Sequence, residues 1–229
     1  MISRYLAPVF TITAIAAAGS VLPISSASAV TMSIQGLYTT GVNNSGQALV
    51  GIQADPHYTL ISQPSGAKVT NSTISPVPAG WAPDNSTSRW IGTNTSAPIG
   101  NYVYQTSFTL PNTAILSTTS INGSWGSDDS ATIFVNGIAT GVASDPSQFG
   151  KLNPFTLSSN NFQYGTNNLT FVVNNSQGLT GLRVAAISGT YEAVPEPLTI
   201  LGSIAALGFG AKMERKFSRK KAKKAESEA

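Results

Sequence analysis

The chain has 229 residues, of which 41% are hydrophobic and only 10% charged, with no cysteine and one histidine. This composition excludes disulfides, thiol nucleophiles, cysteine-ligated metal sites and multi-histidine metal sites. The net charge of +3 comes from the C-terminus, because residues 30–194 hold four basic and six acidic residues, a balance that argues against a nucleic-acid partner.

The first 29 residues have the pattern of a secretory signal peptide. Arg4 supplies a positive charge, residues 5–24 are mostly apolar, and Ala27-Ser28-Ala29 has the small-x-small form of a signal-peptidase site. We expect cleavage after Ala29 and export of the rest, with an uncleaved N-terminal helix as the alternative. Residues 30–193 are then long enough for one domain with a sizeable core.

Short β-strands separated by turn residues are expected throughout residues 30–193. Residues 102–110 alternate between apolar and polar side chains, which is typical of a half-buried strand. Asn136-Gly137 is a strong signal for a two-residue hairpin turn. The other expected strands are 48–53, 58–62, 67–70, 114–125, 131–135, 138–143, 155–157, 169–173 and 182–191.

Helical periodicity with capping residues is absent between residues 30 and 194, so the pattern predicts an all-β fold, an antiparallel β-sandwich. We expect a jelly roll, although the strand pattern alone does not separate it from an immunoglobulin-type sandwich. The ordered motifs from Trp90 to Tyr191, among them I-N-G-S-W at Ile121–Trp125 and D-D-S-A-T-I-F-V-N-G at Asp128–Gly137, resemble the galactose-binding-like jelly roll. The resemblance implies a non-catalytic module whose loops at one end contact glycan.

Asp128 and Asp129 form the strongest candidate for a metal or ligand site in this domain. Adjacent carboxylates, together with backbone carbonyls and water, can supply the six to eight oxygens that Ca²⁺ prefers, and the ion can coordinate sugar hydroxyls. The alternative is that both carboxylates accept hydrogen bonds from loop N–H groups in a turn. We expect no cofactor other than this possible Ca²⁺.

Aromatic side chains are the second class of candidate ligand residues, because an aromatic face matches the apolar face of a sugar ring. Trp81 and Tyr102 are the residues selected for this role. Trp81 lies in a loop rich in proline and glycine and is expected to be exposed. Trp90, Trp125 and Phe134 are expected in the core.

No enzymatic activity is expected. A glycoside hydrolase needs two carboxylates about 5–10 Å apart beside a cleft, whereas Asp55, Asp84 and Asp145 lie in proline-bearing turns where capping accounts for them. His57 has no accompanying Gly-x-Ser-x-Gly nucleophile elbow. A secreted glycan hydrolase is therefore the least favoured function.

Residues 194–229 combine three features in a fixed order: Val194-Pro195-Glu196-Pro197, a charge-free run over 198–211, and eight basic residues within 212–229. Fourteen helical residues cover about 21 Å, short of the hydrocarbon core of about 30 Å. The basic block nevertheless acts as a stop-transfer signal on the cytoplasmic side. We therefore expect a transmembrane helix over about 198–212 and a basic cytoplasmic tail.

The same order resembles the PEP-CTERM sorting signal of exopolysaccharide-producing bacteria with two membranes. The resemblance implies that a membrane-embedded exosortase recognises Pro195, Glu196 and Pro197 and cleaves nearby. The tail after Ala211 is longer than the few basic residues usual in that signal. A plain single-span anchor with a proline-rich stalk is the alternative.

Together these features predict an exported protein that is tethered to the inner membrane and then sorted to the cell surface or extracellular matrix. It is expected to be non-catalytic and to associate with exopolysaccharide. The expected partners are an exosortase, the inner membrane and polysaccharide, and not nucleic acid. The alternative is a purely structural or adhesive surface protein without a small ligand.

Overall fold

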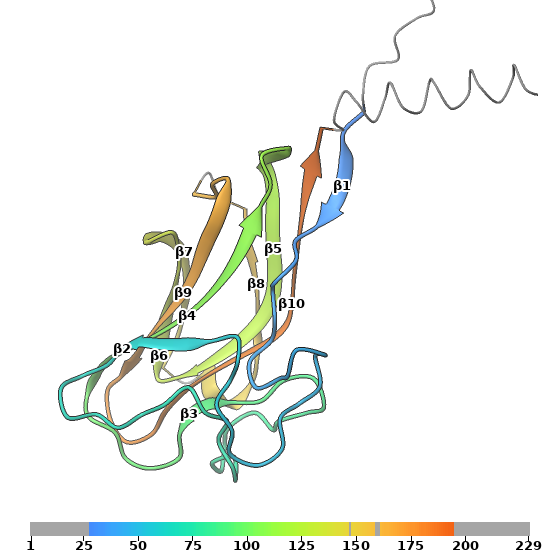
Figure 1. Cartoon of the computed structure of the whole chain (residues 1–229). Helices are drawn as coiled ribbons and strands as arrows, with labels where there is room; N and C mark the ends of the chain where they lie inside the picture. Colours follow the sequence, from blue (N-terminus) through green and yellow to red (C-terminus); the bar gives the residue numbers. More distant parts are fainter. Residues whose placement is uncertain (1–27, 147, 159–160, 195–229) are drawn as a thin grey trace, which may run out of the picture.

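The computed structural model describes residues 28–146, 148–158 and 161–194 (Figure 1). The expected signal peptide up to Ala27 and the expected sorting and anchor segment from Pro195 onward lie outside these residues, so both stay predictions. Within the described part of the chain, no helix has the length and apolar character needed to cross a membrane.

In the described residues, ten strands form two antiparallel sheets, which confirms the predicted all-β sandwich. The first sheet has the order β1-β10-β5-β8, with β3 also paired to β10; the second has the order β2-β4-β9-β6-β7. The first sheet comprises β1 (Val30–Ser33), β3 (Ile91–Thr93), β5 (Ala114–Asp128), β8 (Asn153–Leu157) and β10 (Thr180–Ala193). The second comprises β2 (Thr59–Ser62), β4 (Gly100–Leu110), β6 (Ser130–Val135), β7 (Ile138–Ser144) and β9 (Gly165–Asn175). A 3-10 turn, η1 (Gln148–Gly150), precedes β8.

The core lies between the two sheets and is filled by alternate residues of the long strands. On β4, the predicted period of two is confirmed, since every second side chain from Tyr102 to Leu110 is buried. Phe171 of β9 lies opposite Tyr104 and packs against Trp125 of β5, with ring centroids 5.8 Å apart. Each large side chain buried in this way stabilises the fold by roughly 1.5–3 kcal/mol.

Local chemistry predicts the β6–β7 hairpin correctly but misplaces one of its buried residues. Asn136 and Gly137 both have positive φ, 51° and 80°, as a primed two-residue turn requires. Ala131, Ile133 and Val135 are the buried residues of β6, and Phe134 is not among them. Phe134 lies on the other face of the strand because successive side chains alternate, and it is only partly buried.

Two of the expected strands, 48–53 and 67–70, are absent. Residues 48–53 form a turn in which Gly51 has φ +71°. The carbonyls of Leu49 and Gly51 accept hydrogen bonds from Arg89 instead of from a neighbouring strand. A side chain distant in sequence thus takes the place of a β-ladder.

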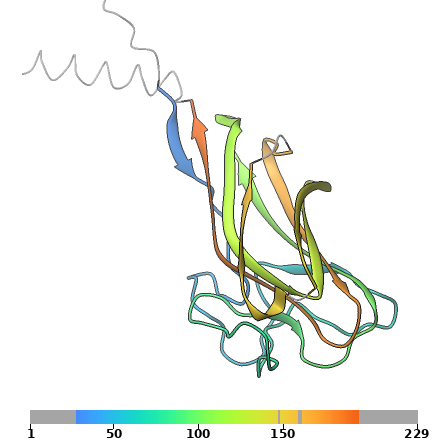
Figure 2. The same ribbon diagram turned by 180° about the vertical axis from the view of Figure 1, so that it is seen from behind.

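The two ends of the sandwich are different in kind (Figures 1 and 2). At one end, here called the terminal end, Val30 of β1 pairs with Ala193 of β10, so both ends of the domain emerge side by side. At the opposite end, here called the loop end, Thr93 pairs with Thr180. The loop end also carries the long irregular segments 41–58 and 63–90.

Candidate functional site

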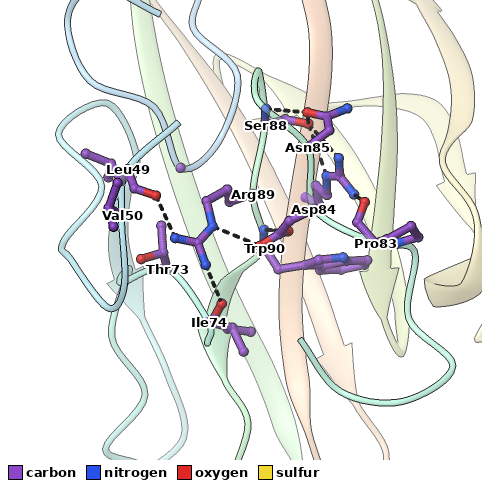
Figure 3. A network of polar contacts seen from close by, with 12 residues as sticks. Leu49, Val50, Thr73, Ile74, Pro83, Asp84, Asn85, Ser88, Arg89 and Trp90 are labelled. Carbon is purple, nitrogen blue, oxygen red and sulfur yellow. Dashed lines mark hydrogen bonds and ion pairs between the residues drawn. The ribbon is translucent and has the colours of Figure 1, made fainter. Parts of the chain in front are cut away.

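Arg89 attaches the long segments of the loop end to one another (Figure 3). Its Nε lies 2.9 Å from Oδ2 of Asp84 in an ion pair. Its terminal nitrogens donate to the carbonyls of Leu49, at 2.6 Å, and Ile74, at 3.1 Å. The second oxygen of Asp84 accepts the N–H of Trp90 at 2.9 Å. The hydrogen bonds from the Arg89 guanidinium to the two carbonyls therefore join segments that are far apart in the sequence, and the ion pair to Asp84 holds the guanidinium in place.

Arg183 of β10 makes a second attachment and is only 2% exposed. Its Nε and Nη2 donate to Oγ of Ser88, at 3.1 and 2.9 Å, and its Nη1 donates to the carbonyls of Ala82 and Pro83. Both arginines are thus occupied in holding loops. Lys68 and Lys151 are the exposed basic residues of the described part of the chain.

The structure brings together three of the predicted ligand residues, Trp81, Asp128 and Asp129. Asp128 ends β5, is 7% exposed and accepts a side-chain hydrogen bond from Trp81. It also shares a hydrogen bond with Asp129. Oδ2 of Asp129 accepts the N–H and the hydroxyl of Ser176, both at 2.7 Å. The carboxyl pair thereby links the loop around Trp81 to the β9–β10 turn.

The pKa values of the two carboxyl groups are shifted in opposite directions, up for Asp128 and down for Asp129. Burial raises the pKa of Asp128 to about 7, and the hydrogen bond to Asp129 and its negative charge act in the same direction. Burial also works against ionisation of Asp129, but hydrogen bonds from Ser176, Asp128 and Gln177 outweigh it and lower the pKa of Asp129. Below about pH 7, Asp128 therefore carries a proton that it donates to ionised Asp129.

Neither aromatic residue selected as a sugar platform is available at the surface. Trp81 was expected to be exposed but is only 7% exposed. Its ring packs on Trp90, with centroids 4.4 Å apart, and covers Gly181, which has no side chain in the way. Tyr102 is fully buried in the core face of β4, and its hydroxyl donates to the carbonyl of Pro98 at 2.8 Å. The prediction that Trp81 is exposed was therefore wrong, and the Tyr102 ring has no face at the surface on which a sugar could stack.

A pocket of about 230 Å³ opens at the loop end, between residues 66–69 and the segment that follows β3. Its wall is fixed from behind by Asn175 of β9, whose Nδ2 donates to the carbonyls of Ala97 and Pro98 at 3.0 and 3.1 Å. The pocket offers one ammonium group and three hydroxyls. Its lining residues are Gly66, Lys68, Val69, Thr93, Thr95, Ser96, Ala97 and Pro98.

The pocket and the carboxyl pair share the β9–β10 turn. Ser176 at the start of this turn donates to Asp129, and the carbonyl of Gly178 accepts the N–H of Ala97 at 2.7 Å. The sequence did not identify the pocket, because serines and threonines are abundant and form no motif there. The one available signal was Lys68, since only four basic residues occur in 30–194.

The geometry leaves the expected Ca²⁺ site a prediction. Residues 28–146, 148–158 and 161–194 contain no group of three or more acidic or histidine side chains arranged to hold a metal ion. Asp128 and Asp129 stand as a pair, and each already takes part in hydrogen bonds. An ion bound there would need the remaining oxygens from backbone carbonyls and water.

No family model matches the chain, and no curated protein matches it. Among solved structures, it is similar to a family 35 carbohydrate binding module from an environmental isolate, at 17% identity and a TM-score of 0.32 over 60% of this chain and 98% of that one. It is also similar to the Stig cyclase Fisc from Fischerella sp. TAU, at 9% identity and a TM-score of 0.41 over 73% and 100%. A third similarity is to Bacteroides uniformis β-glucuronidase, at 19% identity and a TM-score of 0.28 over 38% of this chain and 12% of that much longer one. Likenesses this distant assign neither a family nor a ligand to the chain.

Proposed function

We propose that this chain is an exported, membrane-tethered, non-catalytic surface protein that binds polysaccharide at its loop end. The observation that carries the proposal is the placement of the pocket. Both ends of the domain emerge at the terminal end, where Val30 pairs with Ala193, whereas the pocket lined by Lys68 and Thr93 opens at the opposite end. A tether through the C-terminus leaves that pocket facing outward.

The groups in the pocket favour binding over hydrolysis. Lys68 and the hydroxyls of Thr93, Thr95 and Ser96 can hydrogen-bond to sugar hydroxyls, and the ammonium group favours sugars that carry a carboxylate or sulfate. No carboxylate lines the pocket. The acidic pair nearby shares a proton at close range, unlike the separated acid and base of a glycosidase.

The edges of the folded domain support export and sorting. Ala29, the expected signal-peptidase site, directly precedes β1, so removal of the signal peptide leaves the sandwich complete. Val194 directly follows β10 and is half exposed. The Pro195–Pro197 motif therefore begins at the domain surface, within reach of an exosortase as processing partner.

Polysaccharide binding is tested by affinity electrophoresis of the full chain in gels that contain neutral or acidic polysaccharides, with and without Ca²⁺. We expect retardation by an acidic polysaccharide and at least a tenfold weaker affinity for Lys68→Ala. Lys151→Ala is the matched control, because it removes the same charge from an exposed site that does not line the pocket.

Failure of every polymer to retard the protein would contradict the proposal and leave the structural or adhesive surface protein. Equal losses in both lysine variants would mean that net charge, not the pocket, causes the retention. The masses of the protein in the membrane and secreted fractions test the export steps. A full-length chain in the soluble cytosolic fraction would contradict them.

A further inference from the structure

The terminal end has apolar side chains that no other part of the described chain covers. Val30 and Met32 of β1 are 50% and 45% exposed, and Val194 is 50% exposed. β1 pairs with β10 along one side only in the described residues. Three large apolar side chains are therefore left exposed where the described domain begins and ends. Val30, Met32 and Val194 are here called the apolar tip.

The apolar tip arises because one sheet extends past the other. Val30 and Met32 lie opposite Ala193 and Tyr191, whose side chains pack on the core, so the row continues the inner face of its sheet. Figures 1 and 2 show β1 and the end of β10 standing apart from the strands of the second sheet. This end of the inner face therefore has no facing sheet to cover it, and it can take an apolar partner.

The basic residues of the domain lie far from the apolar tip, so a partner at the tip would bind through apolar contact and not through its charge. Arg89 and Arg183 hold the loop-end segments, and Lys68 lines the loop-end pocket. Lys151 lies two residues before Asn153, which pairs with Trp125 near the loop-end terminus of β5. Glu192 is the charged residue next to the apolar tip. The terminal end is therefore suited to an apolar contact and not to electrostatic attraction by anionic lipid headgroups.

The length of chain between the apolar tip and the expected membrane span identifies the partner. Only Pro195, Glu196 and Pro197 separate Val194 from the charge-free run that begins at Leu198. Three extended residues reach at most about 10 Å, and the headgroup region is about 5–7 Å thick on each side of the hydrocarbon core. The tip is thus held within contact distance of the lipid.

We infer that the apolar tip rests on the outward-facing leaflet of the membrane until the C-terminal segment is processed. This inference rests on the membrane tether of the proposed function. Val30 and Met32 insert at the interface, which seats the terminal end on the lipid and directs the loop end away from it. Cleavage of the tether leaves a contact that is too small to retain the domain, so release follows.

The inference is tested with single cysteines, which the cysteine-free chain allows to be labelled uniquely. Met32→Cys carries an environment-sensitive nitrobenzoxadiazole dye at the tip. Thr31→Cys is the matched control on the opposite face of the same exposed strand, and Ile99→Cys reports from an exposed site at the loop end. The exported chain with its C-terminal segment intact is reconstituted into phosphatidylethanolamine–phosphatidylglycerol vesicles with and without brominated acyl chains.

We expect the dye at position 32 to be blue-shifted and quenched by the brominated lipid, and the dyes at 31 and 99 to emit as in water. A protein that floats with the vesicles while position 32 emits as in water would overturn the inference and leave the tether intact. A blue shift without lipid quenching that grows with protein concentration would identify a second copy as the partner, which also overturns it. Failure to float would remove the tether itself, and the inference with it.

Discussion

At the loop end, buried polar side chains hold long irregular segments in place, whereas at the terminal end an exposed edge strand is held by a single β-ladder. Arg89 and Arg183 together anchor three stretches of loop backbone, at Leu49, at Ile74 and at Ala82–Pro83. β1, by contrast, contributes four exposed residues and one ladder. Where regular structure is absent, a few hydrogen-bonding residues carry the architecture, so substitutions at the loop end should cost far more than substitutions at the terminal end.

The largest effect is expected for Arg183→Met, which keeps an apolar stem and removes the guanidinium. Ser88 Oγ and the carbonyls of Ala82 and Pro83 lose their donor in a buried place. We expect a loss of about 3 kcal/mol in the free energy of unfolding, measured by urea titration. Lys151→Met, an exposed control, should change it by less than about 0.5 kcal/mol. A loss below about 1 kcal/mol for Arg183→Met would show that solvent replaces these bonds.

Next in size is a paired glycine substitution that compares the two ends directly. At the loop end, a Cβ on Gly92 would lie 2.5 Å from the carbonyl oxygen of Thr180, at φ +134°. At the terminal end, Gly165 has φ +78° and open space around it. We expect Gly92→Ala to cost about 2–3 kcal/mol and to weaken binding at the pocket, while Gly165→Ala costs about 1 kcal/mol from backbone strain alone. Equal losses in the free energy of unfolding for the two variants, measured by urea titration, would show that the loop end is no less tolerant of substitution than the terminal end.

The carboxyl pair predicts a dependence of stability on pH. Folded Asp128 keeps its proton up to about pH 7, whereas its ordinary pKa is 3.8, so the folded state binds more protons in this window. The stability that Asp128 contributes is complete below about pH 4 and is lost as the pH rises to 7. Asn keeps the hydrogen bonds to Trp81 and Asp129 without ionising.

Asp128→Asn should therefore be more stable than the natural chain by roughly 2 kcal/mol at pH 8 and about equally stable at pH 4. Urea titrations at both pH values measure this difference. A smaller slope should remain, because burial also raises the pKa of Asp55. Glu192→Gln, an exposed control, should shift both values alike. Parallel pH curves for Asp128→Asn and the natural chain would show that Asp128 is ionised in the folded state.

The smallest effect is expected at the apolar tip. Met32→Ser replaces a half-exposed side chain on an edge strand and should change the free energy of unfolding in water by less than about 0.5 kcal/mol. A loss above about 1.5 kcal/mol would mean that Met32 is covered within the folded domain. The terminal end would then not be the more tolerant of the two.

Local chemistry was sufficient to predict the sandwich and several of its strands. The alternation around Tyr102 and Tyr104 specifies both β4 and its buried face, and Asn136-Gly137 specifies a hairpin. The loop end was not predictable in this way. Residues 48–53 have the composition of a strand. Their carbonyls at Leu49 and Gly51 nevertheless accept hydrogen bonds from the Arg89 side chain and not from a neighbouring strand. Such a contact between distant residues leaves no periodic signal.

The candidate site shows the same division. Asp128 and Asp129 are recognisable as a pair, yet their environment depends on Trp81 and on Ser176, which lies 47 residues beyond Asp129. The burial of Trp81 depends on the missing side chain of Gly181, a hundred residues away. The pocket depends on β3 joining β10, which places Thr93 and the residues after it beside Lys68. These contacts join residues that are distant in the sequence and adjacent only in the fold, so no local sequence motif predicts them.

The position of β10 has a consequence for how the domain comes into being. This strand lies between β1 and β5 and also pairs with β3, yet among the strands of the described residues it is the last to be synthesised. Until residues 180–193 are synthesised, β1 and β3 have no strand to pair with, and the first sheet lacks its central strand. Because the strand in the middle of the first sheet comes last in the sequence, we expect the sandwich to become compact only after residues 180–193 have been synthesised.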